Sequence, residues 1–252
     1  MVMQKNLGVN KPRYPIGIDF AITNYCQARC RSCPRTNPET GEQAEYLNLK
    51  HLDYDVFEKT TTNSRYFNTT DLAFVKFCGQ DGDPMMHPHI TKFIDQAFRL
   101  TSNISINTNG GLRSSNWYTK IGNKYGENLK IVFGIDGIDH DTNWKYREGV
   151  NFNKAWENMV AYCNTPGETQ WDFLIFEWNY HQIPEVAKLA KEINVDSVEF
   201  KLNTGEHGRL DPKKKLLELE TNMGRSKNYG LETLSLKMNG NHSEPAKTGR
   251  LN

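Results

Sequence analysis

Short apolar runs alternate with amphipathic stretches along most of this sequence. The amphipathic stretch Pro184–Ile193 is the clearest, because its apolar residues recur with a helical period and its proline suits a first helical turn. Similar patterns predict helices over Ile90–Leu100 and Lys154–Tyr162. The apolar runs predict six strands, over Gly17–Ile22, Leu72–Cys78, Asn103–Asn107, Lys130–Ile135, Trp171–Glu177 and Ser197–Leu202.

Six units of strand and helix therefore follow one another. Such alternation builds a parallel sheet with helices outside it, and right-handed crossovers curl that sheet in one direction. Six units are fewer than the eight of a closed barrel. The pattern predicts an α/β fold in which the loops after the strands gather at one edge of the sheet.

The alternation decays after Asn203. Residues 206–252 are mostly polar, with a predicted helix at Lys214–Glu220 and a short apolar run at Leu231–Met238. Segments of this composition form linkers or partly ordered lids. We therefore predict a core over residues 1–205 and a C-terminal extension or linker over residues 206–252.

The charge balance limits the classes of partner. The chain has 31 Lys and Arg against 30 Asp and Glu, a formal net charge of +1, which gives no global attraction to nucleic acid or to an anionic membrane. Residues 1–13 lack the apolar core of a signal peptide, and no run of about 18 apolar residues occurs. We expect a cytoplasmic protein with no membrane partner.

Three cysteines, Cys26, Cys30 and Cys33, follow the first predicted strand in a Cys-x3-Cys-x2-Cys spacing. Three thiolates crowded into one loop call for a metal. Structural zinc sites want four ligands, usually as two separated pairs, whereas an iron–sulfur cube can be held by three cysteines with one iron left open. The other cysteines, Cys78 and Cys163, are predicted to be buried thiols, and this usage argues against a secreted disulfide framework.

The cysteine spacing resembles the signature of the radical S-adenosylmethionine (radical SAM) superfamily. The resemblance implies a partial, open (β/α)6 TIM-like barrel with its site at the carboxyl ends of the strands. Relatives of the SPASM and twitch type continue further, so residues 206–252 can also be the start of a truncated domain of that kind. Other elements recur in the family's order over roughly the first four-fifths of the chain: Gly82-Asp83-Pro84, Thr108-Asn109-Gly110, Gly134-Ile135-Asp136-Gly137, Arg147-Glu148-Gly149 and Asn179.

The resemblance also implies two cofactors, a [4Fe–4S] cluster and S-adenosylmethionine. Cys26, Cys30 and Cys33 would ligate three irons, and the open iron would bind the amino and carboxylate groups of S-adenosylmethionine. One electron, from a donor such as flavodoxin or ferredoxin, then cleaves S-adenosylmethionine to a 5′-deoxyadenosyl radical that abstracts hydrogen from a substrate. The implied cofactor-binding residues are Gly79, Gly82, Asp83, Pro84, Asn109, Asp136 and Arg147.

Three positions depart from the family pattern. Asp83 stands where Glu is commoner, Gly134 where a Ser often ends the fourth strand, and Ser32 where an aromatic or large apolar residue precedes the third cysteine. Without that aromatic side chain, contacts to adenine must come from elsewhere. The candidates are Trp171, Phe173 and Phe176, unless these are core residues.

Each implied element also has a simpler interpretation. Gly82-Asp83-Pro84 suits a surface turn, Asn109-Gly110 suits an Asn-Gly turn, and Arg147 suits a solvated surface position. Asn179, ahead of Pro184, is interpreted as a residue that orients a loop or caps a helix. The order of the elements along the chain favours the cofactor interpretation over these alternatives.

The resemblance and the motifs together predict a radical SAM oxidoreductase or maturase-like enzyme that acts on a peptide or a small metabolite. One alternative is a non-catalytic iron–sulfur or zinc binding module. Another is a nucleotide- or RNA-modifying radical SAM enzyme, although the near-neutral charge argues against a long nucleic-acid substrate. Strand-end positions suggest that five residues face the substrate: Tyr25, Gln80, Asp81, Glu177 and Lys201.

Overall fold

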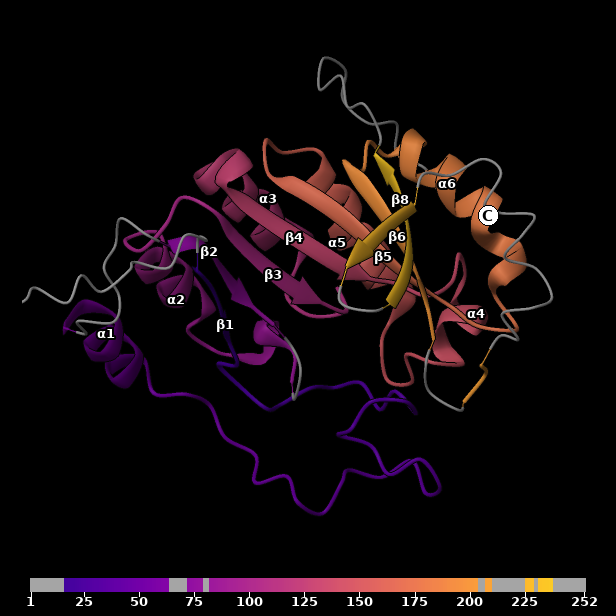
Figure 1. Cartoon of the computed structure of the whole chain (residues 1–252), viewed down its shortest axis with the longest axis horizontal. Coiled ribbons are helices and arrows are strands. Elements are labelled where there is room, and N and C mark those ends of the chain that lie inside the picture. The colour runs from indigo at the N-terminus through magenta and orange to yellow at the C-terminus, as the bar shows by residue number, and fades with distance from the viewer. Residues whose placement is uncertain are drawn as a thin grey trace, which may run out of the picture.

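Six parallel strands lie side by side in the order of the sequence, as Figure 1 shows. The structure is a computed structural model that describes residues 16–63, 72–78, 82–203, 207–209, 225–228 and 231–237. Its parallel strands are β1 (Ile16–Phe20), β2 (Leu72–Phe77), β3 (Ile104–Thr108), β4 (Leu129–Gly134), β5 (Glu168–Ile175) and β6 (Ser197–Leu202). The sheet does not close on itself, which confirms the predicted α/β fold with an open, partial barrel.

Helices connect the strands. The three predicted helices are confirmed as α2 (Ile90–Ala97), α5 (Phe152–Cys163) and α6 (Ile183–Glu192). The pattern did not predict α3, because its sequence SNWYTKIGNKY buries only Tyr118, Ile121 and Gly122. The remaining helices are α1 (Tyr54–Asn63), α3 (Ser115–Tyr125), α4 (His140–Trp144) and the short 3-10 turns η1 (Pro84–Met86), η2 (Gly126–Asn128) and η3 (Tyr180–Gln182).

The sheet has one apolar face and one polar face. On β3, Ile104 and Ile106 are fully buried, whereas Ser105 and Asn107 are partly exposed. Successive side chains of a strand point to opposite faces, so the apolar set packs under the helices that lie behind the sheet in Figure 1. The polar set, which includes Asn107, faces the interior of the open barrel.

The sheet continues beyond β6 with two antiparallel strands. The apolar run at Leu231–Met238 forms β8 (Leu231–Lys237), which pairs with β6, and β7 (Arg225–Asn228) pairs with β8. The predicted helix at Lys214–Glu220 lies outside the described residues. The domain boundary at residue 205 stays a prediction.

None of the helices in the described part of the chain combines the length and the apolar character that crossing a lipid bilayer requires.

Candidate metal and cofactor site

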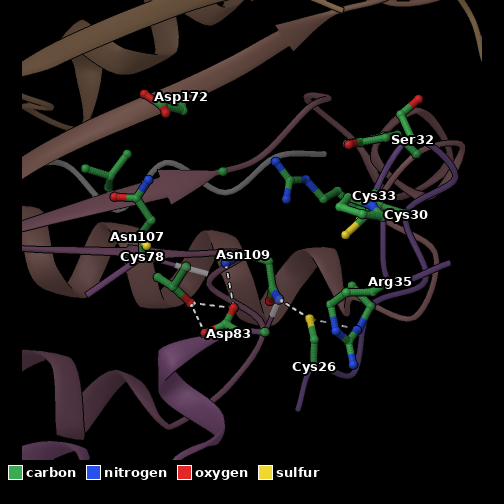
Figure 2. Close-up of a pocket in the computed structure, with 18 of the residues that line it drawn as sticks. Cys26, Cys30, Ser32, Cys33, Arg35, Cys78, Asp83, Asn107, Asn109 and Asp172 are labelled. Carbon is green, nitrogen blue, oxygen red and sulfur yellow. Dashed lines mark hydrogen bonds between the residues drawn. The ribbon is translucent and has the colours of Figure 1, made fainter. Parts of the chain in front are cut away.

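A cavity of about 470 Å³ lies where the carboxyl ends of the strands meet the cysteine-containing loop. All three motif cysteines line it (Figure 2). Residues from β1, β3, β4 and β5 form the other side. The lining residues are Asp19, Cys26, Ala28, Cys30, Ser32, Cys33, Pro34, Arg35, Cys78, Gly82, Asp83, Asn107, Thr108, Asn109, Val132, Gly134, Tyr146, Arg147 and Asp172.

Tight turns and distant loops hold the cysteine loop in place. The amide of Cys33 donates to the carbonyl of Cys30 at 3.0 Å, which closes the turn between the second and third cysteines. The amide of Arg29 donates to the carbonyl of Glu148 at 2.8 Å, so the loop is also tied to the chain after β4. These contacts explain why a segment without helix or strand keeps its three thiols at one cavity.

The motif thiols are largely shielded from water. Burial is the main reason that the pKa of Cys26 rises to about 12 and the pKa of Cys30 to about 11, and the nearby Asp83 charge adds to the effect at Cys26. Both groups are therefore neutral thiols near pH 7, and a metal must displace their protons on binding. Within the described residues, no three His, Cys, Asp or Glu side chains converge on a position for one ion.

The loop after β2 meets the cysteine loop at Gly82. A Cβ atom at this position would lie 2.4 Å from the carbonyl oxygen of Thr23, so only glycine permits this approach. The amide of Asp83 then donates to the carbonyl of Tyr25 at 2.8 Å. The close contact at Gly82 thus joins two protein loops at the edge of the cavity.

The carboxylate of Asp83 is buried and fully engaged with the protein. It accepts from the amides of Met85 and Asn109, each at 2.9 Å, and both of its oxygens lie 3.0 Å from the hydroxyl of Thr108. It caps η1, which Pro84 begins. Burial raises the pKa of Asp83, and the amide donors act against that rise. Asp83 thus joins the loops after β2 and β3 while lining the cavity.

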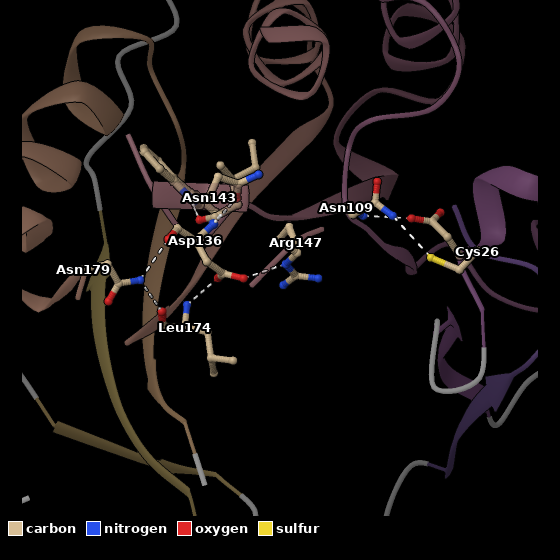
Figure 3. A network of polar contacts seen from close by, with 10 residues as sticks. Cys26, Asn109, Asp136, Asn143, Arg147, Leu174 and Asn179 are labelled. Atoms are coloured by element: carbon tan, nitrogen blue, oxygen red, sulfur yellow. Dashed lines mark hydrogen bonds and ion pairs between the residues drawn. The ribbon is translucent and has the colours of Figure 1, made fainter. Parts of the chain in front are cut away.

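Asn109 places a polar side chain against the first cysteine. Its Nδ2 lies 3.6 Å from Sγ of Cys26, and its Oδ1 accepts from the side chain of Gln27 at 2.7 Å and from the amide of Gly111 at 2.9 Å. Figure 3 shows Asn109 and Cys26 facing each other from different loops. The Asn-Gly turn and the contact with the cysteine therefore coexist.

The buried carboxylate of Asp136, just after the end of β4, forms an ion pair with the partly exposed Arg147 (Figure 3). Nε of Arg147 donates to Oδ2 of Asp136 at 2.6 Å, and the amide of Leu174 donates to Oδ1 at 2.7 Å. Burial opposes the charge on Arg147, but the carboxylate of Asp136 outweighs it and raises the pKa of the guanidinium. Arg147 lines the cavity and Asp136 does not, so Asp136 acts as the support of the cation.

Asn179 completes this support. Its Nδ2 donates to the carbonyls of Asp136 and Leu174 at 2.9 and 2.8 Å, and its Oδ1 accepts from the amide of Phe176 at 2.6 Å. Asn179 is also the N-cap residue of η3, as the cap interpretation predicted, although its side chain forms no cap bond there. The side chain instead joins the carboxyl ends of β4 and β5.

The absent side chain of Gly134 makes room for Arg147. A Cβ atom at Gly134 would lie 2.6 Å from Nη2 of Arg147. A serine at the end of β4 would therefore compete with the guanidinium for the same space. The glycine at position 134 therefore permits the observed position of the Arg147 guanidinium.

Of the five residues expected to face the substrate, the three that the structure describes do not line the cavity. Tyr25 stacks on His51 with 4.6 Å between ring centroids, and Glu177 is exposed; neither lines the cavity. Lys201 pairs with Asp172 at 2.5 Å and with Glu199 at 3.0 Å, and of these three only Asp172 lines it. Gly79, Gln80 and Asp81 lie outside the described residues.

The aromatic residues considered for adenine belong to the core. Trp171, Phe173 and Phe176 are fully buried and none lines the cavity, which confirms the alternative that they are core residues. The prediction for Cys163 is confirmed, because it is buried on α5. The prediction for Cys78 is wrong, because this partly exposed residue follows β2 and lines the cavity.

The motifs did not identify four residues that line the cavity. Asp19, Asn107 and Asp172 lie on the polar face of the sheet, and the alternation of polar and apolar residues in their strands was the signal that could have found them. Arg35 is buried beside the cysteines. Its position two residues after Cys33 was the only hint in the sequence.

The chain combines an open, parallel six-stranded barrel with three cysteines in the loop after β1, and this fold is the one found in the cores of radical SAM enzymes. Solved structures agree at the level of fold. SuiB from Streptococcus suis, bound to S-adenosylmethionine, matches with a TM-score of 0.61 and 16% identity over 82% of this chain and 46% of SuiB. Native anSMEcpe with AdoMet and the Cp18Cys peptide matches with 0.58 and 16% over 79% and 56%.

A third solved structure, TYW1 with a lysine-pyruvate adduct, matches with a TM-score of 0.53 and 14% identity over 83% of this chain and 76% of that one. SuiB has also been solved with the precursor peptide SuiA. The chain spans about half the length of the SuiB and anSMEcpe structures that it matches. No protein-family model matches the sequence, and no curated protein matches it significantly.

Proposed function

We propose that this chain is the core of a radical SAM enzyme that binds a [4Fe–4S] cluster through Cys26, Cys30 and Cys33. The observation that carries the proposal is the cavity itself, in which the three thiols, Asn109 and Arg147 meet on a radical SAM fold. A purely structural metal site would need the thiols alone. An ion-paired arginine and an amide at the same cavity suit a second, zwitterionic ligand.

The cavity fits an iron–sulfur cube by its donor set. Each of the three thiolates binds a different iron of such a cube, so the sulfur atoms need not converge on one point. The described residues offer no such convergence for a single ion. Arg35 and Arg147 line the same cavity and supply positive charge beside a group made negative by thiolates and sulfides.

The chain's own residues would bind and orient S-adenosylmethionine. Arg147, fixed through Nε by Asp136, leaves its two Nη groups for a carboxylate, which suits the methionine end of the molecule. Asn109 and the loop after Gly82 border the same space. A bound cluster, once reduced by one electron, would provide the electron that cleaves S-adenosylmethionine to methionine and a 5′-deoxyadenosyl radical. The barrel wall shields that radical from water.

A peptide is the substrate class that we favour. Support comes from SuiB and anSMEcpe, both of which have been solved with peptides. A small metabolite is the second choice, since TYW1 was solved with a lysine-pyruvate adduct. A flavodoxin- or ferredoxin-like protein of the cytoplasm would supply the electron.

The test is formation of 5′-deoxyadenosine by anaerobically reconstituted protein given S-adenosylmethionine and a strong one-electron reductant. The parent should form the product, and Cys30→Ala should lose both the iron–sulfur absorbance and the product. Cys163→Ala is the matched control, because Cys163 is buried on α5 away from the cavity. A parent that carries a full cluster but forms no 5′-deoxyadenosine would favour the non-catalytic binding module.

A further inference from the structure

Three arginines follow the first cysteine, and they differ in their surroundings. The side chains of Arg29 and Arg31 are 57% and 31% exposed, and both pair with Glu148, at 3.0 and 3.7 Å. Arg35 is only 6% exposed and lines the cavity. One loop thus carries two paired surface cations and one buried cation.

The buried cation has a neutral partner. Nε and Nη2 of Arg35 donate to the carbonyl oxygen of Asn24 at 3.3 and 2.9 Å. No carboxylate among the described residues forms an ion pair with it. The two bonds fix the plane of the guanidinium, which lies beside Cys26 in Figure 2. Arg147, the other cavity arginine, differs because Asp136 neutralises it.

An unneutralised buried cation is unfavourable unless an anion joins it. A cluster held by three thiolates carries net negative charge, and it gains one further negative charge on reduction. A fixed cation beside the cluster therefore interacts more strongly with the reduced cluster than with the oxidised one.

We propose that Arg35 is a positioning residue whose unpaired charge favours the reduced state of the cluster and raises its reduction potential. The inference rests on the proposed function, because it assumes that the three cysteines hold a cluster. Net charge near a cluster is one of the factors that set its potential. The two bonds to Asn24 would keep the guanidinium in place while the electron arrives.

The experiment is a redox titration, followed by electron paramagnetic resonance, of the anaerobically reconstituted chain with measured iron and sulfide content. Arg35→Gln should shift the midpoint potential to a more negative value. Arg35→Lys keeps the charge and should stay near the parent. Arg31→Gln is the matched control, because it removes a cation from the same loop that Glu148 already neutralises, and it should leave the potential unchanged.

Each outcome decides the inference. An unchanged potential in Arg35→Gln at parental iron content overturns it, and so does an equal shift in Arg31→Gln. If Arg35→Gln takes up no cluster, uptake by Arg35→Lys supports a need for the charge, and failure of both variants assigns Arg35 to loop structure and overturns the inference. A parent that takes up no cluster at all refutes the proposed function itself, which is a distinct result.

Discussion

The cavity has two walls of different construction. The motif wall consists of Cys26, Cys30, Cys33, Asp83, Asn109 and Arg147, which come from the cysteine loop and from the loops after β2, β3 and β4. The strand wall consists of Asp19, Cys78, Asn107, Val132 and Asp172. The first wall is a network of buried hydrogen bonds between loops, whereas the second is a set of side chains on a rigid sheet.

The difference teaches which residues are free to act on a ligand. Asp83 and Asp136 are used to hold loops and to support a cation. On the strand wall, Oδ1 of Asn107 has no hydrogen-bond partner among the described residues, and Asp19 is exposed. We therefore expect changes in the motif wall to cost both stability and cofactor binding, and changes in the strand wall to affect the substrate alone.

The largest effect is expected for Asp136→Ala. The change leaves Arg147 without its counter-charge and the amide of Leu174 without its acceptor, which should lower the free energy of unfolding by roughly 3–5 kcal/mol. Urea unfolding followed by circular dichroism measures the loss. Asp141→Ala, an exposed acid on α4, should change it by less than about 0.5 kcal/mol. Equal stabilities of the two variants would contradict the supporting role of Asp136.

A smaller effect is expected for Gly134→Ser. The new side chain would occupy the space of the Arg147 guanidinium and should cost about 1–3 kcal/mol through overpacking. Binding of labelled S-adenosylmethionine to reconstituted protein should weaken because Arg147 is displaced. Unchanged binding would mean that a serine hydroxyl replaces the contact that the arginine makes.

The strand wall should respond differently, as Asp172→Asn tests. Lys201 keeps Glu199 as a partner, so the stability should fall by no more than about 1 kcal/mol. Substrate-independent formation of 5′-deoxyadenosine should equal that of the parent. A large loss of this product would place Asp172 with the cofactor and would erase the distinction between the walls.

The last prediction concerns pH. The thiols of Cys26 and Cys30 ionise near pH 8.5 in an unfolded chain, but their pKa values in the folded, metal-free chain are about 12 and 11. Above about pH 8 the folded state therefore keeps more protons bound than the unfolded state does. A further rise in pH then favours the unfolded state. Denaturant titrations between pH 7 and 9.5 should show falling stability. The double variant Cys26→Ser, Cys30→Ser should flatten this slope, and an identical slope would contradict the burial of the thiols.

The sequence predicted the parallel strands well because each is a short apolar run. Strand β6 begins and ends where the pattern placed it, at Ser197 and Leu202. Helix α3 was not predicted because its interior carries Gly122 and few apolar residues, and its start depends on a cap by Ser114. The antiparallel β8 was not predicted because a single apolar run does not reveal its partner strand.

The sequence motifs predicted the part of the site to which they contribute residues. The three cysteines, Asn109 and Arg147 line one cavity, as their strand-end positions indicated. The inward orientation of Arg35 and Cys78 could not be predicted, because it depends on how the loops pack. The sequence also could not show that Asp136 faces Arg147 rather than the cavity, since that contact joins two turns of the chain across a loop.

The most direct test of the motif wall is the electron paramagnetic resonance spectrum of the reduced, reconstituted chain before and after addition of S-adenosylmethionine. The account predicts a cluster signal that changes when S-adenosylmethionine binds to the open iron, and a weaker change at the same concentration in Arg147→Ala. A cluster signal that S-adenosylmethionine leaves unaltered, or no cluster signal at all, would contradict the assignment of this cavity.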